Sequence, residues 1–106
     1  MKIGNLRHRV TLQQKTVIED DLKQQSEAWT DIASVWACIE PLSGREYFAA
    51  RQENAEVTAK ITIRYRKDVT PDMRAVSEGR VFDVLSVINP GERNISLILM
   101  CKEIPV

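Results

Sequence analysis

Val57-Thr-Ala-Lys-Ile-Thr-Ile-Arg-Tyr-Arg66 is the stretch of sequence that decides the fold. Apolar and polar side chains alternate along its whole length, and alternation with a period of two predicts a β-strand that buries one of its faces. The buried face would hold Val57, Ala59, Ile61, Ile63 and Tyr65, and the other face Thr58, Lys60, Thr62, Arg64 and Arg66.

Further strand-like runs lie on both sides of this stretch. Residues 7–14 alternate more weakly, with His8, Val10 and Leu12 on the apolar side, and residues 73–77 are a short run. Residues 32–39, 81–88 and 95–101 are apolar on both faces. A small sheet with a single core does not need so many strands with apolar residues on both faces. We therefore expect a helix or another subunit to cover the second face.

Turn-forming residues separate these runs. Glu78-Gly79 lies between two of them, where glycine can adopt a positive φ in a hairpin turn, and Asn89-Pro90-Gly91 suits a type II turn before the last strand. Residues 16–28 are polar, begin with the acidic run Glu19, Asp20 and Asp21, and show no pattern. They predict a long, mobile acidic loop.

One segment favours a helix. Ser43-Gly-Arg-Glu46 matches a capping box, and residues 47–55 are mostly good helix formers. The connection at residues 41–56 is therefore expected to carry one short helix. The sequence predicts a single, mainly β domain over residues 1–106: a small six-stranded antiparallel barrel or sandwich, with that helix between its second and third strands.

Charge and composition restrict the function. Lysine plus arginine equals aspartate plus glutamate, at 15 each among 106 residues, whereas domains that grip phosphate backbones usually carry a basic excess. No apolar run is long enough for a membrane helix or a signal peptide, so we expect synthesis and residence in a cytoplasm. Cys38 and Cys101 are expected to be buried, reduced thiols rather than a disulfide.

Catalytic and metal-binding patterns are missing from the sequence. His8 is the only histidine, no serine lies in a nucleophile elbow, and no glycine-rich phosphate loop is present. The adjacent carboxylates at residues 19–21 lack the alternating ligands and central glycine of an EF-hand. We therefore expect no enzyme activity, no catalytic residue, no metal site and no cofactor.

What remains is a surface for interaction. Tryptophan concentrates binding energy at interfaces, and Trp29 and Trp36 are interpreted as core or interface anchors, with the core favoured for Trp36. Mixed charges beside aromatic residues suit subunit contacts or a channel lining, because they set register and choice of partner. The candidate interaction residues are Arg45, Glu46, Tyr47, Phe48, Arg51 and Glu53, with Arg7 and Arg9 on a basic first strand.

Three stretches resemble the head-tail joining proteins of long-tailed phages, also called head closure or head completion proteins. The first is Ile3-Gly-Asn-Leu-Arg-His-Arg-Val-Thr-Leu-Gln13. The second is Val35-Trp-Ala-Cys-Ile-Glu-Pro-Leu-Ser-Gly-Arg-Glu46, and the third is Ile61-Thr-Ile-Arg-Tyr-Arg66 followed by Met73-Arg74 and residues 79–88. Each pattern alone is loose, but together they follow the family's order over nearly the whole chain.

The resemblance implies a structural protein of the virion. Its subunits would form a ring, dodecameric in the related connectors, at the head-tail interface beneath the portal and adaptor proteins. The ring would hold the packaged genome in and offer a docking surface to the tail completion protein, while DNA passes without sequence-specific binding. The connection at residues 41–56 looks like the family segment that approaches the channel and helps to close it. No membrane partner is implied.

Two other function classes compete with this hypothesis. A small β-barrel that binds nucleic acid could use Arg7, Arg9, Arg64 and Arg66, and would show a steep dependence of affinity on salt. A minor hydrolase could use His8 with an acidic partner.

Overall fold

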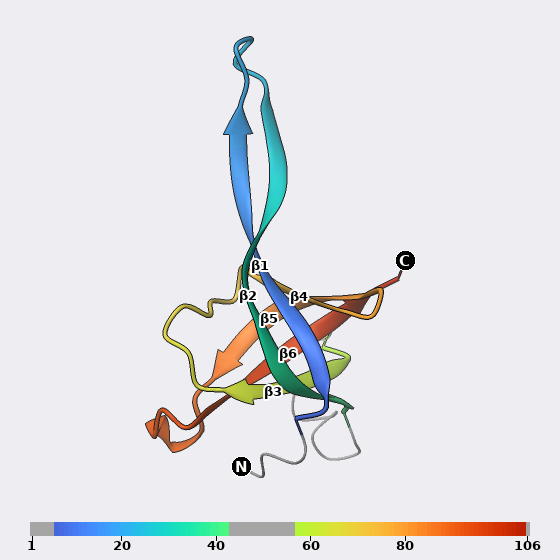
Figure 1. Cartoon of the computed structure of the whole chain (residues 1–106), viewed down its shortest axis with the longest axis vertical. Helices are drawn as coiled ribbons and strands as arrows, with labels where there is room; N and C mark the ends of the chain where they lie inside the picture. Colours follow the sequence, from blue (N-terminus) through green and yellow to red (C-terminus); the bar gives the residue numbers. More distant parts are fainter. Residues whose placement is uncertain (1–5, 43–56, 106) are drawn as a thin grey trace.

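The computed structural model describes residues 6–42 and 57–105, and these residues form a closed antiparallel β-barrel with a long hairpin arm (Figure 1). Its strands are β1 (His8–Glu19), β2 (Gln25–Pro41), β3 (Ala59–Arg64), β4 (Arg74–Ser77), β5 (Arg80–Ile88) and β6 (Ser96–Ile104), and a 3-10 turn, η2 (Pro90–Glu92), precedes β6. The order around the barrel is β1-β2-β3-β6-β5-β4, and pairing of β1 with β4 closes it. The predicted mainly β, six-stranded antiparallel barrel is confirmed.

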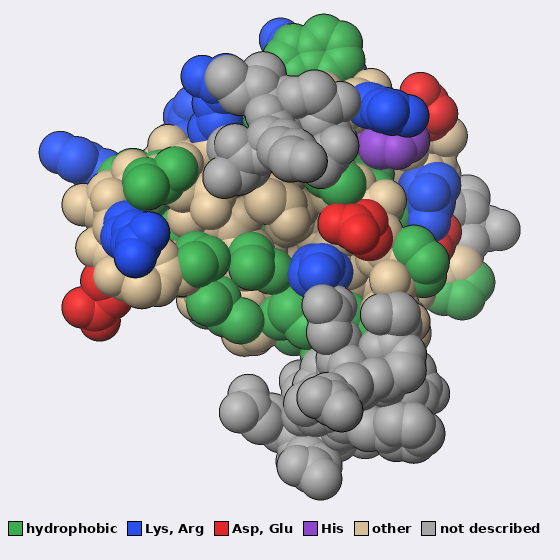
Figure 2. Space-filling model, turned by 90° about the horizontal axis from the view of Figure 1, so that it is seen from below, with side chains coloured by type: hydrophobic (Ala, Val, Ile, Leu, Met, Phe, Trp, Pro, Cys, Tyr) green, Lys and Arg blue, Asp and Glu red, His purple; other side chains and the backbone are tan. Residues whose placement is uncertain are grey.

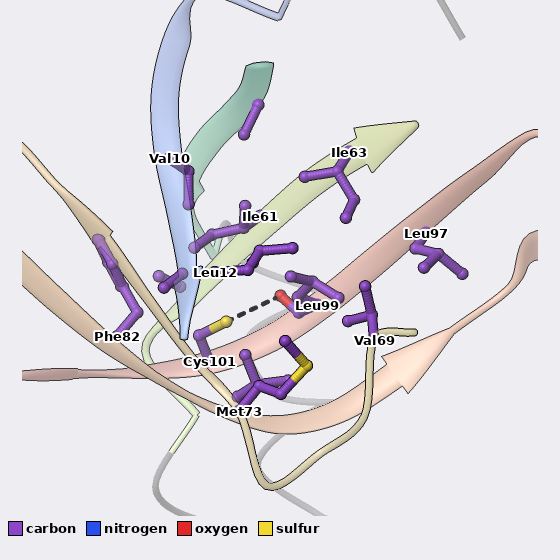
Figure 3. Packing of buried hydrophobic residues seen from close by; sticks show 14 residues of the cluster. Val10, Leu12, Ile61, Ile63, Val69, Met73, Phe82, Leu97, Leu99 and Cys101 are labelled. Atoms are coloured by element: carbon purple, nitrogen blue, oxygen red, sulfur yellow. Dashed lines mark hydrogen bonds between the residues drawn. The ribbon is translucent and has the colours of Figure 1, made fainter. Parts of the chain in front are cut away.

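The barrel interior holds the hydrophobic core (Figure 3). β3 shows why the alternation was informative: Ala59, Ile61 and Ile63 are buried, while Lys60 and Thr62 between them are partly exposed. Tyr65 is partly buried against the same core. The buried cluster comprises Val10, Leu12, Ala37, Ala59, Ile61, Ile63, Val69, Met73, Ala75, Phe82, Val84, Leu97, Leu99 and Cys101.

The two predicted turns are present. Glu78 and Gly79 join β4 to β5 and have φ values of 50° and 81°, as a two-residue hairpin turn of this kind requires. At the other turn, the Glu92 N–H donates to the Asn89 carbonyl oxygen at 2.9 Å, and Gly91 has a φ of 62°.

The expected loop at residues 16–28 is wrong. β1 runs on to Glu19 and β2 begins at Gln25, so only residues 20–24 form a turn. We call residues 14–30 the arm. The arm pairs in register from Gln14 with Thr30 to Glu19 with Gln25, and it projects from the barrel as a two-stranded ribbon (Figure 1). Neither face of the arm covers a core, so polar and apolar side chains occur on both faces without alternation.

A bulge and a polar network mark the root of the arm. Leu12 pairs with Ala33 but Gln13 pairs with Asp31, so Ile32 is an extra residue in β2, and such bulges bend a hairpin. Gln13 links both neighbouring strands: its side-chain nitrogen donates to Asp31 at 2.7 Å, and its oxygen accepts from Arg74 Nε at 2.6 Å.

The predicted helix between the second and third strands falls on residues 43–56, which lie outside the described residues. It stays a prediction, and the same holds for any role of the connection at residues 41–56 in closing a channel. Of that connection, Pro41 ends β2 and Leu42 follows it.

Candidate interaction surfaces

The outer face of the barrel carries a row of mostly apolar residues. Cys38 on β2 pairs with Thr62 on β3, Thr62 pairs with Ile98 on β6, and Ile98 pairs with Ile88 on β5. We call these four residues the outer row. They face away from the core because their strand neighbours, such as Leu97 and Leu99, are buried.

The outer row is only partly covered. Ile88 is 45% exposed, and Ile98 is half-buried. This explains why β5 and β6 were apolar on both faces in the sequence. Seen from the end opposite the arm, hydrophobic side chains lie beside one another on the surface between scattered lysines and arginines (Figure 2). Apolar surface of this kind is typical of a site where another protein binds.

A second surface is a cleft of about 540 Å³ beside the start of β1. We call it the Trp36 cleft. Its cationic residues are Arg9, Arg64 and Arg66, and the Arg9 guanidinium lies 5.2 Å from the centre of the Trp36 ring. The complete lining is Leu6, Arg9, Ser34, Val35, Trp36, Arg64, Tyr65 and Arg66.

The charges of the Trp36 cleft are unevenly neutralised. Arg66 makes two hydrogen bonds to the Asp68 carboxylate, at 3.0 and 2.9 Å, and this guanidinium lowers the pKa of Asp68. Arg9 donates to the Ser34 hydroxyl at 3.2 Å, and neither Arg9 nor Arg64 has a carboxylate partner within the described ranges. The cleft therefore presents two uncompensated guanidinium groups beside an aromatic ring.

A third surface is the end of the arm. Val17, Ile18 and Leu22 are 62%, 53% and 79% exposed, and they are among the most exposed large hydrophobic residues that the structure describes. Glu19, Asp20 and Asp21 lie between them in the chain. Lys15 and Glu27 form an exposed ion pair of 2.9 Å nearer the barrel.

The residues that the sequence predicted to take part in interactions lie in different environments. Arg9 contributes to the Trp36 cleft, whereas Arg7 is exposed before β1 and does not line it. Placing Trp36 in the core was wrong, because its side chain is 52% exposed on β2. Trp29 is half-buried at the root of the arm, under the Arg74 guanidinium at 4.2 Å. The remaining candidates lie outside the described residues and stay predictions: Arg45, Glu46, Tyr47, Phe48, Arg51 and Glu53.

Sequence reasoning missed the arm as an interaction element. Val17, Ile18 and Leu22 were included in a loop, and their exposure only became visible once β1 and β2 were seen to extend past the barrel. The one available signal was the run of β-favouring residues Thr16-Val17-Ile18, which continues the strand after residue 14.

The part of the chain that the structure describes lacks two other kinds of feature. It brings together no group of three or more histidine, cysteine or acidic residues that could hold a metal ion. Nor does it contain a helix long and apolar enough to cross a membrane.

The two cysteines are free thiols; the expected burial is confirmed for Cys101 and was wrong for Cys38. Burial raises the pKa of the Cys101 thiol to about 12, and Cys101 is fully buried, although Cys38 is only half-buried. Burial also raises the pKa of Cys38, and its hydrogen bond to the Glu40 carboxylate, 3.3 Å long, raises it further.

We expect a thiol reagent to label the folded protein at Cys38 and to leave Cys101 unmodified until the barrel unfolds. Only a thiolate that the reagent can reach reacts, and Cys101 is neither ionised nor accessible at pH 8. Mass spectrometry of peptides after a time course would measure this. A Cys38→Ser variant is the control, and rapid labelling of its remaining thiol in the folded state would contradict the expectation.

Comparison with known proteins identifies the family. The sequence matches the family described as phage head completion protein over residues 1–104. This chain belongs to that family. It is 30% identical over 107 residues to the head completion protein gp7 of Enterobacteria phage HK97, with 96% of each chain covered. The resemblance seen in the sequence is thereby confirmed, and the family is one of structural phage proteins.

Two solved structures share the fold of this head completion protein. Protein SF1141 from Shigella flexneri 2a matches with a TM-score of 0.82 and 30% identity, covering 97% of this chain and 96% of that one. A chain in the virion of a native gene transfer agent particle matches with a TM-score of 0.61 and 17% identity, covering 95% and 97%. The second likeness shows the fold alone.

Proposed function

We propose that this head completion protein is a subunit of a connector ring at the head-tail interface of a phage or prophage virion. The ring closes the packaged head and gives the tail its docking surface. The observation that carries the proposal is the match to the head completion family over residues 1–104. In the proposed cycle the chain is made in the host cytoplasm and joins the virion only after DNA packaging.

The surfaces of the barrel support assembly. The outer row and the arm expose apolar side chains at different places on the molecule, from Leu22 on the arm to Ile88 on β5. Contacts between unlike surfaces of identical subunits repeat with a constant rotation, and they form a ring when that rotation closes. We propose a homo-oligomeric ring, dodecameric as in the related connectors, that meets the portal and adaptor proteins on one side and the tail completion protein on the other.

The balance of charge supports a passage for DNA rather than a DNA-binding site. The net charge of the chain is zero, so there is no general excess of cations to retain a phosphate backbone. We propose that DNA passes through the ring without sequence-specific binding. Residues 45, 46, 47, 48, 51 and 53 stay the proposed contact or channel-facing positions of the connection between β2 and β3.

The mass of the purified protein, measured by light scattering over a concentration series with and without the portal-adaptor complex, tests this function. We expect a large ring, either alone or on the complex, because a template lowers the entropic cost of ordering the first subunits. A monomer that ignores the complex at every concentration would refute the connector function. DNA-filled heads incubated with the protein should also retain their genome longer than untreated heads.

A further inference from the structure

The end of the arm is a hydrogen-bonded turn. The Asp20 carboxylate accepts hydrogen bonds from the Leu22 and Gln24 N–H groups, at 3.0 and 2.8 Å. The Asp20 N–H donates to the Gln24 carbonyl oxygen and the Lys23 N–H to the Asp20 carbonyl oxygen, each at 3.0 Å, and Lys23 adopts a φ of 60°. This network fixes the backbone on which Leu22 is presented.

The fixed turn gives the arm tip, residues 18–22, a defined chemical character. Ile18 and Leu22 are 53% and 79% exposed, and Glu19, Asp20 and Asp21 supply negative charge between them. A large apolar side chain held on a preorganised turn costs little entropy to dock. The partner must therefore offer an apolar hollow bordered by cations.

The Trp36 cleft has those properties. Leu6, Val35 and Tyr65 supply apolar lining beside the exposed Trp36 ring, and the cleft volume of about 540 Å³ is sufficient for a leucine side chain and its neighbours. Arg9 and Arg64 have no carboxylate partner within the described ranges. Their two positive charges complement the negative charges of Glu19 and Asp21, whereas the Asp20 carboxylate is hydrogen-bonded within its own turn.

The tip cannot reach the cleft of its own chain. Arg9 and Glu19 lie on one continuous strand, and a strand rises about 3.3 Å per residue, so they are about 33 Å apart. Figure 1 shows the tip at one end of the molecule and the first residues of β1 at the other, along a longest extent of 50 Å. A contact between tip and cleft must join two copies.

We propose that the arm tip of one subunit docks into the Trp36 cleft of the next copy, with Leu22 against the Trp36 ring and Glu19 and Asp21 beside Arg9 and Arg64. The proposal rests on the connector function and names the contact that joins the ring. The two surfaces are unlike, so the interface is head-to-tail and each subunit uses its own tip and its own cleft once.

Single-stranded nucleic acid is the other occupant that arginines beside an aromatic ring can accept. The observations favour the arm tip for two reasons. Asp68 already neutralises Arg66, which leaves two free cations rather than the extended basic track that a strand of phosphates needs. The same chain also supplies an exposed tip that is both acidic and apolar.

Two complementary variants test the contact. Asp21→Lys combined with Leu22→Ser disables the tip and keeps the cleft, whereas Arg64→Glu disables the cleft and keeps the tip. All three side chains are exposed, so both proteins should fold. We would titrate the unlabelled cleft variant into the ¹⁵N-labelled tip variant and follow the amide spectrum. The expected result is a saturable shift of the Trp36 indole and Ser34 amide signals, with one-to-one stoichiometry because neither variant can extend a chain.

The matched control is unlabelled tip variant added to labelled tip variant, which should shift nothing. Absence of cleft shifts up to about 1 mM titrant, where even a contact worth only about 4 kcal/mol would be half-saturated, would overturn the proposal. Shifts at Ile88 and Ile98 instead would also overturn it and assign the tip to the outer row. Saturable, salt-sensitive shifts of the Trp36 signals by an oligodeoxythymidine, with none from the tip, would overturn it in favour of nucleic acid.

Assembly on the portal-adaptor complex separates this proposal from the proposed function. If wild-type protein forms a ring and the tip variant forms it equally well, only the tip-cleft contact fails. If wild-type protein forms no ring, the connector function itself fails. The expected result is a ring from wild-type protein and none from either variant or from their mixture. In the mixture, one molecule of each variant forms a pair that has no intact surface left to bind a third molecule.

Discussion

Replacing Phe82 with alanine is expected to lower the free energy of unfolding by about 3–5 kcal/mol. Phe82 is the largest fully buried side chain among the residues that the structure describes (Figure 3). Across the strands it pairs with Ala75, whose small side chain leaves room for the ring. Truncation removes the apolar contact and leaves a cavity that neighbouring strands, held in a closed barrel, cannot fill.

Urea denaturation followed by circular dichroism would measure this loss. A domain of this size has only about 5–15 kcal/mol of stability, so Phe82→Leu, which keeps most of the volume, provides a second, milder variant if Phe82→Ala does not fold. Val17→Ala on the arm is the control and should change stability by less than about 0.5 kcal/mol, because Val17 is 62% exposed. A loss below about 1 kcal/mol for Phe82→Ala would show that the barrel is not packed as described.

Shortening the arm is expected to abolish ring assembly while leaving the barrel folded. Lys15 pairs with Trp29, so residues 16–28 can be replaced by Asn-Gly, which forms a two-residue hairpin turn between them. None of the deleted residues is buried in the core, and Trp29 keeps its contact with Arg74. We expect the free energy of unfolding to change by no more than about 1 kcal/mol, since no fully buried side chain is lost.

Light scattering on the portal-adaptor complex and urea denaturation would measure the two effects separately. Lys15→Ala is the matched control: it breaks the exposed ion pair with Glu27, which is worth at most about 1 kcal/mol, and it should assemble normally. Normal assembly of the shortened protein would contradict a role for the arm. Loss of the folded barrel would contradict the view that the arm carries no core packing.

The ion pair between Arg80 and Glu103 joins two strands, β5 and β6, that lie side by side in the barrel. Arg80 at the start of β5 makes two hydrogen bonds to Glu103 on β6, at 3.0 and 2.9 Å, and this contact lowers the pKa of Glu103. A carboxyl whose pKa is lowered on folding stabilises the fold above its unfolded pKa, and the contribution is lost as the pH falls. Both side chains are well exposed, so the effect is small.

The sequence alone determined the strands that build the core and the turns between them. In β3 the alternation of Ala59, Ile61 and Ile63 with polar residues follows from the pleat of a strand, which sends successive side chains to opposite faces. Gly79 marked its hairpin because a positive φ is easiest for glycine. Apolar residues on both faces of β5 and β6 also indicated a second apolar surface that a helix or another subunit would cover, and the structure locates it in the partly exposed outer row.

Only the tertiary structure decided where the arm ends and where Trp36 lies. The arm has no buried face, so no periodicity could separate its strands from a polar loop; it is defined by the register between β1 and β2, which is a long-range property. Trp36 follows Val35 and precedes Ala37 in a run that is apolar on both faces, and only closure of the barrel determines which face turns inward. The Trp36 cleft combines residues from β1, β2 and β3 with their flanking segments, and side chains so distant in sequence are brought together only by the closed sheet.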